Sequence, residues 1–209
     1  MSRTAERIAD AALRLFNRKG YASTTLAEIA ADVGISQGNL TYHFRTKLDL
    51  ALHLSERVRV VTEGRRAGKA PADLTDEYVG HLLFSMDLTW RYGFLMRDRG
   101  IFDDADAVGP PSPILLASFE DRRRLIGRIA DAGLFRADPG VDLELLARSL
   151  WILSRHWIDH LREMEQCAEP DWPDMERGIR HHFAVLLPNL TAAGRRRFVA
   201  ALGKVGVEI

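Results

Sequence analysis

A short run of polar side chains, at residues 36–43, has the composition of a surface that contacts bases. Gln37 and Asn39 carry amides that can pair bidentately with the edge of an adenine, and the methyl group of Thr41 can contact a thymine methyl. Gly38 has no side chain and leaves room for a close approach of the backbone. These residue types predict a segment that reads DNA in the major groove.

Donors suited to phosphate groups follow in the same segment. Tyr42, His43 and Lys47 carry a hydroxyl, an imidazole and an ammonium, which can hold DNA phosphates without reading the sequence. Lys47 also stands at the beginning of a predicted helix, where exposed backbone N–H groups favour an anion. We therefore predict phosphate contacts at these three residues.

Two helices and a tight turn must position this segment. The spacing of apolar residues predicts a first helix over residues 3–19. Its apolar face consists of Ile8, Ala12, Leu15 and Phe16. Thr25 and Glu28 have the spacing of a capping box at the beginning of a second helix. Gly34 then permits a left-handed turn, and Ser36 is a suitable N-cap for the third helix.

A longer helix follows the polar segment. Leu40 and Phe44 share one helical face and can pack on the second helix. Thr46 and Asp49 form a second capping box before a long apolar stripe. That stripe consists of Leu50, Leu54, Val58 and Val61. The alternative is an ordinary helical hairpin with a polar exposed side, but two capping boxes, a glycine turn and a polar third helix together favour DNA binding.

The stretch from Arg3 to about Leu54 resembles the DNA-binding domain of the TetR family of transcriptional regulators. The matching elements are Gly20-Tyr21, Thr24-Thr25, Ile29-Ala30, Gly34-Ile35-Ser36, Gly38-Asn39-Leu40, Tyr42-His43-Phe44 and Lys47 through Leu50. The resemblance implies that Thr25, Tyr42, His43 and Lys47 hold phosphates. It also implies that Gln37, Asn39 and Thr41 face bases, with Ser36 and Gly38 in the same DNA-binding segment.

The charge of the chain is unevenly distributed. The 209 residues have a formal net charge of zero. Residues 1–70 contain 12 basic and 7 acidic residues, a charge of +5, and residues 71–209 contain 17 and 22, a charge of −5. DNA phosphates bind to positively charged surfaces, so this distribution predicts phosphate binding by the basic N-terminal part and not by the acidic remainder of the chain.

The composition also indicates the compartment. The single cysteine, Cys167, excludes an intrachain disulfide and fits a reducing cytosol. The sequence has no apolar run of membrane-spanning length, and the first helix begins directly after the N-terminus without a signal peptide. We therefore predict a cytoplasmic protein that has no membrane partner.

Helical patterns without a convincing strand continue through the rest of the chain. Gly64, Gly68 and Pro71 interrupt the helical periodicity between residues 63 and 75. The sequence thus predicts an all-α protein: a three-helix helix-turn-helix DNA-binding domain at residues 2–62, and a larger helical ligand-binding and dimerisation domain at residues 63–209.

Bulky apolar side chains in the second domain predict a pocket for a small molecule. The candidate ligand-binding residues are Tyr78, Leu82, Met86, Trp90, Phe94, Trp151, Arg155 and His156. An ordinary hydrophobic core is the alternative for any one of them. The family resemblance implies an inducer pocket in this region, so we predict a small apolar or aromatic effector.

Two long helices are candidates for a dimer interface. The predicted helix at residues 141–165 is apolar on two sides, so both sides must be buried. One stripe contains Leu146, Leu150, Leu153, Trp157, Leu161 and Met164, and the other contains Leu143, Ala147, Trp151 and Ile158. A central helix in a monomer is the alternative. The resemblance favours a homodimer formed by this helix and the next one, at residues 173–187.

Two further clusters are weaker candidates. His156 and His160 share a helical face with Glu163 nearby, but a polar cluster or ligand contacts explain them better than a metal. We predict neither a metal nor a cofactor. The runs Arg122–Arg124 and Arg195–Arg197 are expected to solvate helix exteriors. The first run could instead meet an anionic ligand or the acidic residues Asp103, Asp104 and Asp106.

The interpretation we favour is a dimeric, ligand-responsive regulator, most simply a repressor, that binds the two half-sites of a palindromic operator in double-stranded DNA. The alternative is an α-helical small-molecule-binding protein or enzyme whose helix-turn-helix is only structural. The sequence has no serine–histidine–aspartate order, phosphate loop or dense carboxylate–histidine set. We therefore predict that the protein is not an enzyme.

Overall fold

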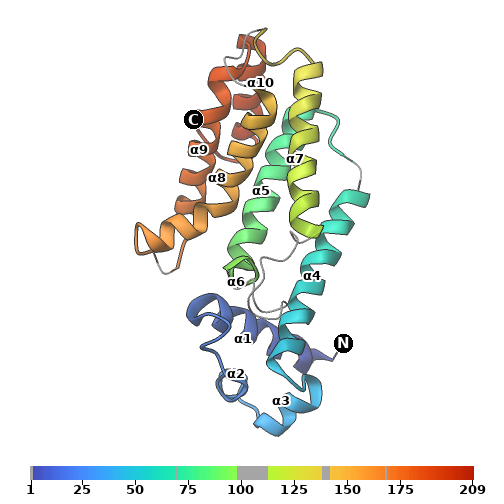
Figure 1. Ribbon diagram of the computed structural model, residues 1–209, viewed down its shortest axis with the longest axis vertical. Coiled ribbons are helices and arrows are strands. Elements are labelled where there is room, and N and C mark those ends of the chain that lie inside the picture. Colours follow the sequence, from blue (N-terminus) through green and yellow to red (C-terminus); the bar gives the residue numbers. More distant parts are fainter. Residues whose placement is uncertain (1, 69, 98–112, 138–141, 168) are drawn as a thin grey trace. The chain divides into compact units, whose positions relative to one another are not determined.

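The computed structural model describes residues 2–68, 70–97, 113–137, 142–167 and 169–209. The regular elements of these residues are helices, and a single isolated bridge pairs Phe135 with Leu190 (Figure 1). The predicted all-α fold is confirmed.

The helices have the following bounds. They are α1 (Arg3–Lys19), α2 (Leu26–Val33), α3 (Gln37–His43), α4 (Lys47–Ala67), α5 (Leu74–Arg91), α6 (Gly93–Arg97), α7 (Pro113–Asp131), α8 (Leu143–Glu163), α9 (Trp172–Leu186) and α10 (Ala192–Gly203), with a 3-10 turn at Leu187–Asn189. The bounds of α1 match the predicted range, residues 3–19, and α2 and α3 begin directly after the predicted caps Thr25 and Ser36.

The helices form two compact units whose limits differ from the predicted boundary at residue 62. The first unit contains α1 to α4, the end of α5 from Leu88, and α6. The second contains α5 up to Asp87 and the helices from α7 onward. Helix α4 continues through Gly64, because a glycine within a helix costs only about 1 kcal/mol relative to alanine.

The apolar face of α1 forms the centre of the first unit. Ile8, Ala12 and Phe16 are completely buried on it. The Phe16 ring packs on Phe94 of α6, with centroids 5.0 Å apart. Phe94 therefore belongs to the core of the first unit. The i, i+4 pattern that suggested a place for it in a ligand pocket is interrupted, since α5 ends at Arg91.

Aromatic rings fill the core of the second unit. Tyr78 of α5, Phe183 of α9 and Phe198 of α10 are buried and meet at centroid distances of 5.4 to 6.4 Å. Helix α8 packs between α7 and α9. Leu150 and Leu161 on the inner face of α8 are completely buried, as one of its two predicted stripes requires.

Backbone hydrogen bonds join the end of α7 to the beginning of α10. The N–H of Thr191 donates to the Leu134 carbonyl at 2.8 Å, and the N–H of Arg136 donates to the Asn189 carbonyl at 2.9 Å. Gly194 lies directly against this junction. A Cβ atom added there would approach the Leu134 carbonyl oxygen to 2.5 Å, which is far inside van der Waals contact.

Replacing Gly194 by alanine should therefore destabilise the protein. We expect a loss of about 1–3 kcal/mol, typical of overpacking a rigid site, measured by denaturant unfolding. Gly127→Ala is the matched control, because Gly127 lies within α7 with nothing within 4 Å of an added Cβ. The control should gain about 0.5–1 kcal/mol of helix stability. Equal stability of the two variants would contradict the close packing at Gly194.

Candidate nucleic-acid interface

The turn before α3 and the cap at its first residue fix this short helix. Gly34 adopts a left-handed conformation with φ +74°, and its N–H donates to carbonyls at the end of α2. The Ser36 hydroxyl accepts the N–H of Asn39 at 3.2 Å. On the inner side of α3, Leu40 is completely buried. The predicted Gly34 turn and Ser36 cap are confirmed.

The exposed side of α3 carries the side chains predicted to read bases. Gln37, Gly38 and Asn39 are exposed to solvent. Thr41 is half-buried, and its hydroxyl donates to the Gly38 carbonyl at 3.1 Å. What Thr41 can offer to a base is therefore its methyl group, as the sequence suggested.

Two candidate phosphate donors lie at the end of α3. Tyr42 is 85% exposed and meets the His43 ring edge-on at a centroid distance of 5.2 Å. His43 is half-buried. Arg45, two residues beyond the helix, is also exposed and joins no ion pair within the described part of the chain. An extended guanidinium at this position suits a phosphate.

Thr25 serves as a cap. Its hydroxyl accepts the Glu28 N–H at 3.2 Å, and the Glu28 carboxylate accepts the Thr25 N–H at 2.9 Å, which completes the predicted capping box. Lys19 donates to Glu28 at 2.5 Å. The bond from Lys19, together with those from Thr25, lowers the pKa of Glu28 to about 2. Any contact of Thr25 with a phosphate would have to add to these bonds.

Lys47 has a different role from the predicted one. Its ammonium donates to three backbone carbonyls, those of Tyr21 at 2.7 Å, Ala22 at 3.1 Å and Thr24 at 2.9 Å. It also lies over the Tyr21 ring, 4.4 Å from the centroid. An ammonium has only three N–H donors. Lys47 therefore ties the segment before α2 to the beginning of α4 and has no donor left for a phosphate.

The candidate ligand-binding residues separate into two groups. Tyr78, Leu82 and Met86 are buried in the second unit. Trp151 of α8 is half-buried there, and its indole N–H donates to the Ser118 hydroxyl at 3.4 Å. Arg155 is buried, with its guanidinium 5.9 Å from the Trp151 ring centroid.

The other three candidates do not join this group. Trp90 and Phe94 belong to the first unit. His156 is exposed on α8 and pairs with Asp159 at 3.3 Å, one turn along the same helix. These three are therefore removed from the candidate pocket. His160 turns to Glu165, also at 3.3 Å. In the described ranges, no three histidine, cysteine or acidic side chains are placed to hold a metal ion.

The three consecutive arginines of α7 are not equivalent. Arg123 and Arg124 are exposed and pair with Glu120 and Asp121, as a solvated helix exterior requires. Arg122, however, is only 1% exposed, which corrects the prediction for this residue. Asp103, Asp104 and Asp106, the acidic residues considered as its partners, lie outside the described residues.

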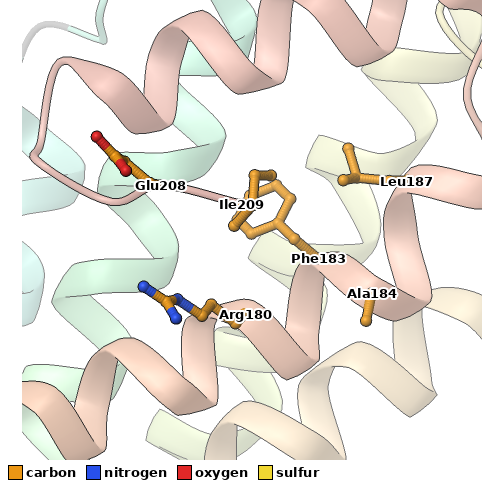
Figure 2. Close-up of a pocket in the computed structure, with 6 residues that line it drawn as sticks. All are labelled: Arg180, Phe183, Ala184, Leu187, Glu208 and Ile209. Carbon is orange, nitrogen blue, oxygen red and sulfur yellow. The ribbon is translucent and has the colours of Figure 1, made fainter.

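An open pocket of about 580 Å³ lies between α9 and the residues Glu208 and Ile209, and none of the predicted ligand residues lines it. It is lined by Arg180, Phe183, Ala184, Leu187, Glu208 and Ile209. Figure 2 shows the charged side chains of Arg180 and Glu208 toward one end, and Ala184 and Leu187 toward the other. Because Ala184 is exposed, this pocket is a groove in the surface.

Three capped helices that present an exposed polar third helix define a helix-turn-helix DNA-binding protein. The profile of the bacterial regulatory proteins of the tetR family matches residues 8–54, and a second profile, described as a bacterial transcriptional repressor, matches residues 112–198. The chain is 30% identical over 197 residues to the HTH-type transcriptional regulator AcrR of Shigella flexneri, covering 88% of this chain and 87% of AcrR. The chain belongs to the TetR family of transcriptional regulators.

Solved structures agree with this assignment. A TetR-family regulator from Marinobacter aquaeolei VT8 matches with a TM-score of 0.69 at 25% identity, covering 97% of this chain and 98% of that one. At the level of the fold alone, a protein from Saccharomonospora viridis solved in complex with choline matches with a TM-score of 0.63 at 18% identity, covering 91% of this chain and 98% of that one. Across the described residues, no helix is both long enough and apolar enough to cross a membrane.

Lys47→Met should destabilise the protein, because three carbonyls lose a charged donor. We expect a loss of about 1–3 kcal/mol in the free energy of unfolding. The matched control is Arg45→Met, which removes the same charge from an exposed side chain and should change stability by less than about 0.5 kcal/mol. In DNA titrations the control should reduce the salt slope by about one. If Lys47→Met unfolded at the wild-type denaturant concentration, the three-carbonyl role would be wrong.

Proposed function

We propose that this TetR-family regulator is a repressor that binds a palindromic operator as a homodimer and leaves it when a small effector binds. The observation that carries the proposal is the exposed face of α3, where Gln37 and Asn39 stand free of the core on a helix fixed by its caps. The protein would act by binding and not by catalysis. Because its target is chromosomal DNA, we place its action in the cytoplasm.

Base reading follows from the chemistry of these two side chains. Each amide has one acceptor and two donors, which match the N6 and N7 positions of adenine in the major groove. Gly38 between them adds no side chain that would hold the helix away from the groove floor. Tyr42, His43 and Arg45 supply phosphate contacts that set the register without adding specificity.

The exposed apolar residues of α8 and α9 support a dimer. Leu145 and Ile152 on α8 are 59% and 48% exposed and lie two turns apart on one face, and Val185 of α9 is exposed as well. The predicted partner stripe is corrected, since Ala147 and Ile158 are buried within the chain. The two helices proposed for the interface stay the same, but a different face of α8 would meet the partner.

An effector would act by favouring one of two dimer conformations. Half-sites on DNA lie about 34–36 Å apart, so a small change in the distance between two α3 helices weakens binding. Tyr78, Leu82, Met86, Trp151 and Arg155 are the candidate side chains that remain for an effector in the second unit. The choline-bound structure of a fold neighbour supports a ligand site in regulators of this fold.

Gln37→Ala and Asn39→Ala should each relax discrimination at particular operator positions. Each lost bidentate contact should cost about 1–3 kcal/mol at the affected base pair and nothing at the others. The measurement is a set of titrations with single-base variants of the DNA upstream of the protein's own coding region. Arg45→Met serves as the control, because it should weaken all sequences equally. Unchanged discrimination in both alanine variants would argue that α3 does not read bases.

Ile152→Asp should convert the dimer into a folded monomer at micromolar concentration, because a carboxylate would be buried without a partner in the interface. Sedimentation velocity measures the change, and circular dichroism should show unchanged helicity. Val199→Asp is the matched control on α10, where an apolar residue of similar exposure lies outside the proposed interface. A monomeric wild-type protein, or a dimeric Ile152→Asp variant, would refute the interface.

A further inference from the structure

A positively charged side chain is buried in the second unit, and its partners in the described part of the chain are uncharged. Arg122 lies in the middle of α7 and is 1% exposed. Its Nη1 donates to the Tyr78 hydroxyl at 3.2 Å and to Nε2 of His182 at 3.1 Å. Its Nη2 lies 3.5 Å from the Ser85 hydroxyl. In the part of the chain that the structure describes, none of the ion pairs includes Arg122.

The partners of Arg122 stay neutral at physiological pH. Burial raises the pKa of Tyr78, so its hydroxyl keeps its proton. Burial, followed by the nearby Arg122 charge, holds the pKa of His182 well below its usual value. Because a guanidinium can only donate, Nε2 of His182 must accept from it. Within the described ranges, the cluster therefore carries one positive charge without an acidic partner.

One edge of the guanidinium has unused hydrogen-bonding capacity among the described residues. Nε and Nη2 point along the same edge, which is the one that binds a carboxylate with two parallel hydrogen bonds. Among the residues that the structure describes, the buried Nε has no hydrogen-bond partner, and Nη2 makes one long contact, with Ser85. The other side of the group, at Nη1, is occupied by Tyr78 and His182.

The buried Arg122 guanidinium lowers the stability of the ligand-free protein, because an apolar side chain of similar size would avoid the cost of desolvating a charge. The neighbouring Arg123 and Arg124 each have a carboxylate partner on α7 itself. We propose that the effector carries an anionic group, a carboxylate, that binds the Nε–Nη2 edge of Arg122. This inference rests on the proposed function, because it specifies the chemistry of the effector.

The surroundings of Arg122 indicate what the rest of the effector would contact. One turn toward the beginning of α7, Ser118 and Phe119 are half-buried. Trp151 of α8 contacts both, with its ring 5.8 Å from the Phe119 ring and its N–H on the Ser118 hydroxyl. An aromatic or alkyl body would lie against these rings. The effector class is thus an amphipathic monocarboxylate.

Arg122 on α7 also bonds to residues on two other helices. An anion bound to Arg122 would therefore affect how these three helices pack. Its neutral partners Tyr78 and His182 lie on α5 and α9, and they bond to each other at 2.8 Å. A carboxylate on the guanidinium would compete for its donors and weaken its bonds to these partners. The packing of α5 and α9 against α7 would therefore differ between the free and bound states.

The test uses the full-length protein and matched pairs of probes: alkanoates of six to twelve carbons and 2-naphthoate, each beside its primary amide. At least one carboxylate should raise the thermal midpoint, and its amide should bind at least about tenfold more weakly by calorimetry. Arg122→Met should lower affinity for that carboxylate by about 10- to 100-fold and leave the amide unchanged. Arg123→Met, the neighbouring exposed arginine, should bind both as the wild type does.

Three results would overturn the inference: no carboxylate of the panel binds, acid and amide bind equally, or Arg122→Met keeps the wild-type affinity. If Arg122→Met does not fold, the affinities of the wild-type protein for each carboxylate and its amide still test the inference. DNA titrations separate this inference from the proposed function. If wild-type protein fails to bind DNA, the proposed function is wrong. If it binds DNA but ignores every carboxylate, only the assignment of the effector is wrong.

Discussion

A helix of seven residues cannot hold its own position, and the DNA-binding unit is built around this constraint. Isolated helices shorter than about 12–15 residues are marginal in water, and α3 buries only Leu40. Its position comes from its ends: a left-handed Gly34 before it and a Ser36 cap at its beginning. Lys47 then bonds the backbone before α2 to the beginning of α4. The exposed face of α3 is free for DNA because other residues hold the helix.

The second unit is held together differently, by large rings and one buried polar cluster. Phe183 and Phe198 pack around Tyr78, whose hydroxyl faces the Arg122 and His182 pair. Apolar contacts alone would allow the five described helices of this unit to pack in many different rotations about their own axes. The hydrogen bonds of the cluster require one arrangement of α5, α7 and α9. Under the proposed function, a bound effector would alter this cluster without unfolding the core.

The sequence predicts the first unit well because its signals are local. The capping box at Thr25, the turn at Gly34 and the bounds of α1 depend on residues a few positions apart. Contacts between distant residues could not be predicted in this way. The carbonyls that occupy Lys47 lie 23 to 26 residues earlier, and the burial of Arg122 depends on how α7 is rotated against α5 and α9. A run of three arginines gives no local sign that one of them points inward.

The proposed function requires that two copies of α3 enter the major groove of one operator. Chemical protection of guanine N7 atoms, mapped together with a hydroxyl-radical footprint of the bound DNA, tests this claim directly. We expect two protected major-groove segments on one face of the duplex, with centres about 34–36 Å apart, or 10–10.5 base pairs. A single protected segment, or protection confined to the minor groove, would contradict this mode of DNA binding.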